Sequence, residues 1–190
     1  MKEEEINMAN GVIVESRIQA TNIDALNRTA QAQIAVAGGG LVALTESGVQ
    51  GNEVWTAAAP TSGTLGGLWI AYNPSEHLTA VGTKFFAGLS EDPRDYTNLA
   101  NRPFDCFKPE VGDEIDITVD CVDNTASSVV AGDILESKAG QTTFTRVAAA
   151  TGATSGSTAF KVEYVGTAPF PAGSIGMEQV KMFRCVCVQA

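Results

Sequence analysis

Apolar and polar side chains alternate without a break from Glu114 to Cys121. The two-residue period of a strand places them on opposite faces, with Ile115, Ile117, Val119 and Cys121 on one face and Glu114, Asp116, Thr118 and Asp120 on the other. Gly112 and Asp113 supply turn chemistry just before this stretch, so the strand has a marked start. The pattern predicts a half-buried strand.

Similar patterns predict short strands in the first half of the chain, at residues 12–20, 29–36, 41–45, 53–57, 68–72 and 84–89. Residues 21–37 also fit a helix, because Thr21 is a suitable cap, an apolar stripe runs from Ile23 to Ile34, and glycines begin at Gly38. The strand is favoured for residues 29–36, because the flanking segments are all strand-like.

In the second half, strands are predicted at residues 115–122, 128–135, 142–147, 160–165 and 180–188. Short strands separated by turns favour closure into an all-β unit. Residues 148–158 contain no large side chain, so an exposed, mobile loop is expected there. Pro169 and Pro171 are incompatible with a central strand.

The fold class predicted from these patterns is mainly β. We expect a small barrel or sandwich at residues 104–190, a β-rich subdomain at residues 12–98 with room for one short helix, and an extended N-terminal arm at residues 1–11. Residues 90–103 are dense in turn formers and connect the two halves. The Gly-Asp pairs at 112–113 and 132–133 both precede apolar residues, which indicates one turn device used twice.

Composition and charge narrow the classes of partner. The chain has 190 residues, of which 12 are basic and 22 acidic, for a formal net charge of −10. Such a surface repels phosphate, and only Lys181 and Arg184 lie within three residues of another basic residue, so no nucleic-acid partner is expected. The acidic N-terminus has no apolar h-region, and no apolar run approaches the length of a membrane span. We therefore expect that the protein does not associate with a membrane and that it is made in a cytoplasm.

Candidate chemistry is sparse. The four cysteines are expected to be reduced and buried. His77 is the only histidine in the sequence, which argues against a Ser-His-Asp triad and against a zinc site that needs several histidine ligands. The acids from Asp113 to Asp123 are oxygen ligands of the kind calcium prefers, but they lack the spacing of a calcium loop, and a solvated strand face is the favoured interpretation. A glycosidase needs two carboxylates on either side of the scissile bond, and the sequence has many acidic residues but nothing that identifies one such pair. The sequence predicts no catalytic residue, metal or cofactor.

Large aromatic side chains concentrate in the first half, at Trp55, Trp69, Tyr72, Phe85 and Phe86. Core packing is the favoured interpretation. A cluster of anchors at a protein interface is the functional alternative, since Trp and Tyr are enriched at such positions. A platform on which a sugar stacks is a third option.

Several stretches together resemble the capsid decoration (cement or head auxiliary) proteins of tailed bacteriophages. The features that carry the resemblance are the polar arm, the glycines at 38–40, DPRDYTN at 92–98, FKPEVGDEIDIT at 107–118, and a strand at the C-terminus. The resemblance implies a noncatalytic virion protein, made in the bacterial host cytoplasm, that binds the outer surface of an assembled head and staples neighbouring capsomers. Its implied partners are the major capsid protein and further copies of itself, as in a trimer.

The resemblance also implies which residues would contact a partner. The arm would add a strand to the edge of a sheet in the capsid protein, because main-chain hydrogen bonds give such pairing its affinity. The candidate partner-binding residues are Met1, Lys2, Glu3, Glu4, Glu5, Ile6, Asn7, Trp55, Trp69 and Tyr72. The alternative is a carbohydrate-binding or adhesin module of a phage head or tail, which requires Trp69 and Tyr72 to lie flat and open on one face.

Overall fold

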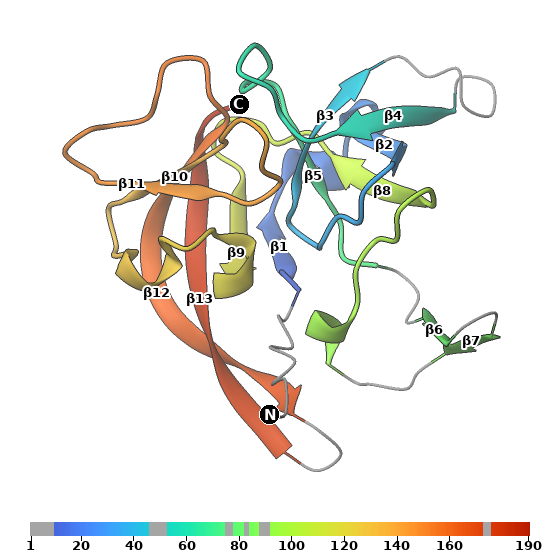
Figure 1. Cartoon of the computed structure of the whole chain (residues 1–190). Helices are drawn as coiled ribbons and strands as arrows, with labels where there is room; N and C mark the ends of the chain where they lie inside the picture. Colours follow the sequence, from blue (N-terminus) through green and yellow to red (C-terminus); the bar gives the residue numbers. More distant parts are fainter. Residues whose placement is uncertain (1–9, 46–52, 75–77, 82–83, 88–91, 173–175) are drawn as a thin grey trace, which may run out of the picture.

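The computed structural model describes residues 10–45, 53–74, 78–81, 84–87, 92–172 and 176–190. Within these ranges the chain forms a six-stranded sheet, a closed barrel and a separate two-stranded hairpin (Figure 1). The strand order is β1-β9-β13-β12-β10-β11 in the sheet and β2-β4-β3-β5-β8 in the barrel. The mainly β class predicted from the sequence is confirmed.

The sheet consists of β1 (Ile13–Arg17), β9 (Glu114–Thr118), β10 (Ile134–Glu136), β11 (Thr145–Val147), β12 (Ala159–Ala172) and β13 (Gly176–Gln189). The barrel consists of β2 (Asn27–Ala32), β3 (Leu41–Thr45), β4 (Val54–Ala58), β5 (Trp69–Ala71) and β8 (Pro103–Phe107), and the hairpin of β6 (Leu78–Val81) and β7 (Lys84–Ala87). Three-residue 3-10 turns are η1 (Gln19–Thr21), η2 (Asp24–Leu26), η3 (Pro93–Asp95), η4 (Val119–Cys121) and η5 (Ala126–Ser128).

The closed barrel is built mainly from the first half of the chain, whereas the strand spacing suggested a barrel or sandwich at residues 104–190. Closure depends on the parallel pairing of β2 with β4, which sets Thr29 opposite Val54. A spacing argument does not reveal such a pairing, because it assumes that successive strands form antiparallel hairpins. The core cluster of the barrel combines four alanines (Ala30, Ala32, Ala57 and Ala71) with larger side chains such as Phe104.

The ambiguous stretch before the glycines is a strand, as favoured. η2 turns the chain at Asp24–Leu26, and β2 then runs from Asn27 to Ala32. β2 ends earlier than predicted, and Val36 forms only an isolated bridge with Asn98.

The alternation on β9 holds as far as Ile117, and both Ile115 and Ile117 are fully buried. The strand then ends at Thr118, earlier than predicted, and residues 119–121 form η4. Thr118 was expected on the solvated face but is fully buried, because its hydroxyl accepts a hydrogen bond from the main-chain N–H of Val12 at 3.0 Å. A main-chain N–H just before β1 thus replaces water as the partner of this hydroxyl.

The two Gly-Asp pairs form the same turn. Gly112 and Gly132 have φ values of 99° and 96°, and the aspartate that follows each accepts a hydrogen bond from the main-chain N–H three residues earlier. Each glycine N–H donates to a carbonyl of a long strand, Cys187 on β13 or Val162 on β12. The second turn occupies part of the strand predicted at residues 128–135, so β10 has only three residues.

The segment at residues 148–158 is not exposed throughout, contrary to the expectation. Ser157 and Thr158 are fully buried. Thr158 donates its main-chain N–H to the carbonyl of Leu65, and its hydroxyl accepts a hydrogen bond from the N–H of Leu68 at 3.2 Å. Polar contacts with the other half of the chain therefore hold this end of the loop, although it has no large side chain to bury.

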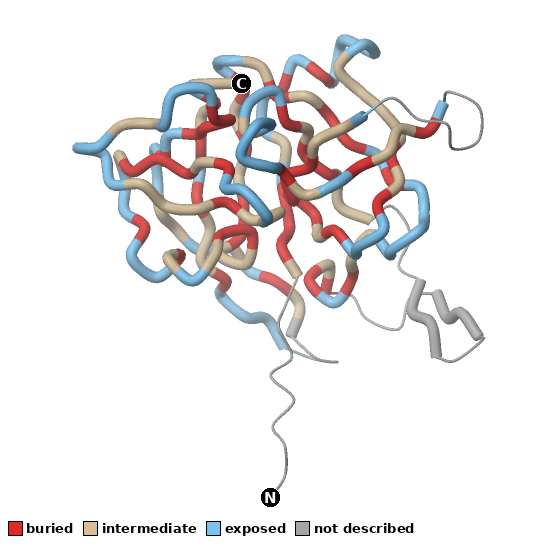
Figure 2. Tube along the Cα trace, turned by 45° about the horizontal axis from the view of Figure 1, so that its top comes forward, coloured by how far each residue is buried: buried red, intermediate tan, exposed pale blue. Residues whose placement is uncertain are grey.

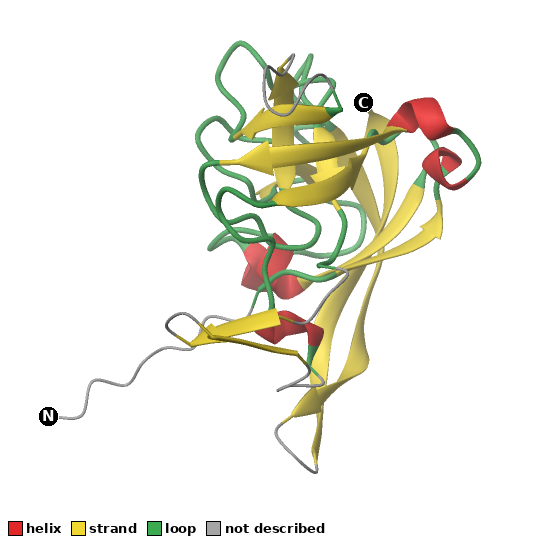
Figure 3. Cartoon of the chain, turned by 90° about the vertical axis from the view of Figure 1, so that its right-hand side faces the viewer, coloured by secondary structure: helices red, strands yellow, loops and turns green. Residues whose placement is uncertain are grey.

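β12 and β13 form an antiparallel hairpin of two 14-residue strands that extends beyond the rest of the sheet (Figures 1 and 3). We call residues 166–171 and 176–181 of this hairpin the ribbon. Pro169 and Pro171 lie in the ribbon, where β12 pairs with β13 alone, so neither proline interrupts a central strand, as the sequence predicted. Phe170 and Val180 pack against Val12 in a small core cluster.

One large core cluster joins the sheet to the barrel. It contains Ile70 and Phe107 from the barrel together with Ile115, Phe160 and Phe183 from the sheet. Buried segments accordingly meet in the middle of the molecule (Figure 2). In the part of the chain that the structure describes, no helix has the length and apolar character needed to cross a membrane.

Candidate functional site

Trp55 and Trp69, two of the predicted contact residues, belong to the barrel interior. Both are partly buried and pack against the barrel core. The guanidinium of Arg28 lies over both indoles, with its central carbon 5.8 Å from the ring centroid of Trp55 and 5.7 Å from that of Trp69. A cation in this position is attracted by both ring faces. The geometry is that of core packing, the interpretation favoured from the sequence.

Tyr72 lies on the other side of the same barrel wall. Its ring packs on Phe107, with centroids 4.9 Å apart, and its hydroxyl donates to the side-chain oxygen of Asn27 at 3.0 Å. Burial, with nearby acidic groups, raises the pKa of Tyr72 to about 12. Because Trp69 joins the barrel core and Tyr72 the central core, the two side chains do not form a shared stacking platform. The side chains of Phe85 and Phe86 lie outside the described part of the structure.

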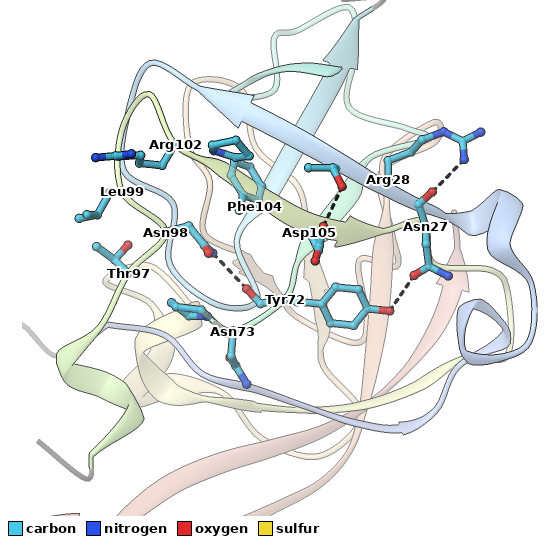
Figure 4. Close-up of a pocket in the computed structure, with 13 residues that line it drawn as sticks. Asn27, Arg28, Tyr72, Asn73, Thr97, Asn98, Leu99, Arg102, Phe104 and Asp105 are labelled. Atoms are coloured by element: carbon cyan, nitrogen blue, oxygen red, sulfur yellow. Dashed lines mark hydrogen bonds between the residues drawn. The ribbon is translucent and has the colours of Figure 1, made fainter. Parts of the chain in front are cut away.

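An open pocket of about 1050 Å³ lies beside Tyr72 (Figure 4). We call it the Tyr72 pocket. Its walls come from the start of β2, the residues that follow β5, the segment at residues 97–102, and the start of β8. The pocket opens near the point where β5 leaves β8, after the N–H of Tyr72 makes a last hydrogen bond to the carbonyl of Asp105. Its size is that of a pocket for a small molecule or a short peptide segment.

The three asparagine side chains in the walls are engaged within the protein. Asn27 accepts from the Tyr72 hydroxyl, and Asn98 donates to the carbonyl of Tyr72 at 3.0 Å. Asn73 accepts from the N–H of Ile13 at 2.9 Å and donates to its carbonyl at 2.6 Å. These amides therefore fix the shape of the pocket and join it to β1.

The other residues in the walls include apolar and charged side chains. Leu99 is 41% exposed, and Pro74 and Pro103 also line the pocket. The charged residues are two arginines, Arg28 and Arg102, and one aspartate, Asp105. The Arg28 guanidinium lies over Trp55 and Trp69, on the barrel side, and Asp105 accepts a hydrogen bond from the hydroxyl of Thr29 at 2.9 Å.

The arm residues predicted to bind a partner, residues 1–7, lie outside the described part of the structure, which begins at Asn10. Asn10 is held firmly, because its main-chain N–H and its side-chain amide both donate to the carbonyl of Arg94, at 2.8 and 3.0 Å. Arg94 follows Pro93 in η3. The arm therefore joins the body at this turn.

Arg94 connects η3 to the ribbon. Its guanidinium donates to both carboxylate oxygens of Asp92 and, at 2.7 Å, to Glu178 of β13, while it lies 5.4 Å from the ring centroid of Phe170. These hydrogen bonds raise the pKa of Arg94 further. We call Asn10, Asp92, Arg94, Phe170 and Glu178 the Arg94 cluster. It brings the start of the body and the ribbon to the same place.

The ribbon carries exposed side chains. Met177 is 64% exposed, more than any other large hydrophobic residue in the described part of the chain, and Glu178, Gln179 and Pro169 are also exposed. Sequence reasoning did not identify Arg94 or the ribbon as part of a site. The pairing of Arg94 with Glu178 spans 84 residues and has no local signal, although the Asp-Pro-Arg sequence is typical of a capped turn.

The acidic residues considered for metal binding have other partners. Glu114 pairs with Arg17 and Asp116 with Arg184, while Asp123 accepts hydrogen bonds from two threonine hydroxyls. Among the described residues, no group of three histidine, cysteine or acidic side chains is placed to hold a metal ion. His77 lies outside those residues. The expected solvated face is corrected at Asp113, which is 2% exposed and accepts hydrogen bonds from the main-chain N–H groups of Gln19 and Glu110, while Glu114 and Asp116 are half-buried.

The four cysteines are free thiols and all are buried, as the sequence predicted. Burial raises the pKa of Cys106, Cys121 and Cys187 to about 12 and that of Cys185 further still. Since the thiolate is the reactive form, these groups are poor nucleophiles at neutral pH.

Comparison with protein-family models, with curated proteins and with solved structures finds no match to this chain, so its function is argued from the sites described above.

Proposed function

We propose that this chain is a noncatalytic virion structural protein that binds the outer surface of an assembled phage capsid and staples neighbouring capsomers. Its proposed partners are the major capsid protein and further copies of itself. The proposal joins the resemblance of the sequence to capsid decoration proteins with one structural observation, the attachment of Asn10, where the described chain begins, beside the ribbon.

That placement follows from the Arg94 cluster. Asn10, the first described residue, binds the main chain of Arg94, and the Arg94 side chain binds Glu178 on the ribbon. Asn10 and the ribbon therefore lie at the same end of the molecule. A ribbon beside the point where the arm begins suits a protein that contacts two neighbouring subunits of a lattice.

Stapling of this kind does not require a strong single contact. A standard interface buries about 800 Å² per partner. When many copies bind one shell, or when one copy binds at two points, the second contact is intramolecular and gains an effective concentration of about millimolar. An arm that adds a strand to a partner sheet gains affinity from main-chain hydrogen bonds, which depend little on its side chains.

The test is cosedimentation with undecorated heads of the phage that encodes the chain. We expect the full chain to pellet with the heads and a variant lacking residues 1–9 to pellet much less. On the ribbon, Met177→Glu should also reduce binding, whereas Val130→Glu, which replaces another exposed apolar residue (56% exposed) outside the ribbon, should not.

Two outcomes would count against the proposal. Failure of the full chain to bind heads at any concentration would overturn it. Binding that survives both the deletion and Met177→Glu would remove the arm and the ribbon from the mechanism. Sedimentation velocity of the same samples tests the proposed self-association, for which a trimer is expected.

A further inference from the structure

We propose that the outer edge of β13 in the ribbon accepts an extended segment of the capsid protein as an added strand. This contact rests on the proposed function and names the surface through which the ribbon meets the shell. Three features support it: the direction of the main-chain groups along β13, the prolines on β12, and the packing that holds the ribbon in place.

The main-chain groups of β13 alternate between its two edges, as in any antiparallel strand. Cys187 exchanges hydrogen bonds with the turn just before β9, so it faces the side of β13 on which β9 lies. Every second residue from there faces the same side, and β9 pairs with this side until it ends at Thr118. Beyond that point, the N–H and C=O groups of Met177 and Gln179 therefore face outward from the ribbon.

This edge is open in the part of the chain that the structure describes. There, no hydrogen bond reaches the outward main-chain groups of Met177 and Gln179, and both side chains are exposed. A row of unpaired N–H and C=O groups is a template for a further strand. A strand added here would lie in line with β9 and would extend the sheet along the ribbon (Figure 3).

The opposite edge of the ribbon is closed by proline. Pro169 lies opposite Gln179 and Pro171 opposite Met177, so the nitrogens of both prolines face away from β13. Proline has no N–H to donate, and natural sheets use it to prevent pairing at an edge. The ribbon therefore offers a strand partner one complete edge, that of β13.

The body of the protein holds this edge in place. Side chains alternate along the ribbon, so Glu178 and Val180 point away from the face that carries Met177. Glu178 accepts a hydrogen bond from Arg94 at 2.7 Å, and Val180 is only 4% exposed and packs with Phe170 in a small core. An edge that is already ordered loses little freedom when a strand pairs with it, which favours binding.

The capsid protein is the occupant that these features favour. Strand pairing takes its affinity from main-chain hydrogen bonds, so the edge can bind an extended segment of varied sequence. A second copy fits less well, because the two-fold register that pairs Met177 of one ribbon with Gln179 of the other sets Glu178 opposite Glu178. Like charges directly opposite each other destabilise a sheet. On a shell, in contrast, every bound copy meets the same segment, and the contact is repeated.

The test compares two proline variants in cosedimentation with undecorated heads. Gln179→Pro removes an outward N–H from β13 and Thr167→Pro removes one from β12, so neither breaks a hydrogen bond between the two strands. Pro169 and Pro171 show that the ribbon accommodates proline at outward positions. We expect Gln179→Pro to weaken binding about fivefold, as for one lost main-chain hydrogen bond, and Thr167→Pro to leave binding unchanged.

Hydrogen–deuterium exchange examines the same edge without a substitution. The amides of Met177 and Gln179 should exchange about tenfold more slowly when the full chain is bound to heads, because a partner strand then protects them. The outward amide of Thr167 should exchange at the same rate in both states. The amides of Glu178 and Val180 face β12 and serve as the slow reference.

The outcomes separate this contact from the proposed function. Heads that bind the full chain and Gln179→Pro equally well would overturn the added strand and leave the capsid proposal standing, as would an equal loss in both proline variants. Exchange at Met177 and Gln179 that slows in the free chain as its concentration rises would assign the edge to a second copy and overturn the contact with the capsid. Heads that do not bind the full chain would overturn the capsid proposal itself, and this contact with it.

Discussion

At the scale of single residues, burial separates two ion pairs of the same chemistry. The side chains of Arg94 and Asp92 are each only 10% exposed and form several hydrogen bonds. Those of Arg184 and Asp116 are 52% and 19% exposed, and they form two. Water screens the second pair, whereas it reaches the first pair poorly.

Arg94→Ala should therefore lower the free energy of unfolding by about 3 kcal/mol, because it removes the guanidinium that donates several hydrogen bonds to a buried carboxylate. Arg184→Ala should cost less than about 1 kcal/mol, as is usual for an exposed pair. Urea denaturation of both variants measures the difference. An equal loss of unfolding free energy in the two variants would show that the buried Arg94 pair stabilises the fold no more than the exposed Arg184 pair does.

At the scale of elements, the sequence predicted best what local patterning determines. The alternation at Ile115 and Ile117 identified β9, and the repeated Gly-Asp pair identified a common turn. The barrel was harder to foresee, because its closure depends on the parallel pairing of β2 with β4 across intervening β3. The Tyr72 pocket was not predicted at all, since four separate segments form its walls.

The common turn makes a specific prediction for Gly112 and Gly132. A Cβ at Gly112 would meet no atom within 4 Å, and one at Gly132 would meet only Ala149 at 3.9 Å, so the cost of alanine is backbone strain alone. At φ values of 99° and 96° we expect each alanine variant to lose about 1–3 kcal/mol of stability.

Gly63→Ala is the matched control for both turn variants. Its Cβ would also meet nothing within 4 Å, and its φ lies outside the positive range. Alanine there should be neutral or slightly stabilising, because it reduces the freedom of the unfolded chain. Thermal denaturation compares the three variants, and an equal loss at Gly63 would refute the strain argument.

At the scale of the whole molecule, the barrel and the sheet share one core and are joined by main-chain contacts. Phe107 of the barrel and Phe183 of the sheet belong to the same fully buried cluster. The N–H of Leu41 on β3 donates to the carbonyl of Thr142 at 2.7 Å, and β1 joins the sheet although it precedes the barrel in the chain. Neither unit can lose its packing without exposing a face of the other.

This shared core predicts a single cooperative unfolding transition. Pulsed alkylation in a urea series, read by peptide mass spectrometry, should give the same midpoint for Cys106 in the barrel and Cys185 in the sheet, because both thiols are fully buried. Phe183→Ala should lower the free energy of unfolding by about 3–5 kcal/mol and shift both midpoints together to lower urea. Tyr164→Ala, at a 63% exposed aromatic residue on β12, should move neither. If Cys185 became reactive at lower urea than Cys106, the sheet would be an independent unit, and the common core would not couple it to the barrel.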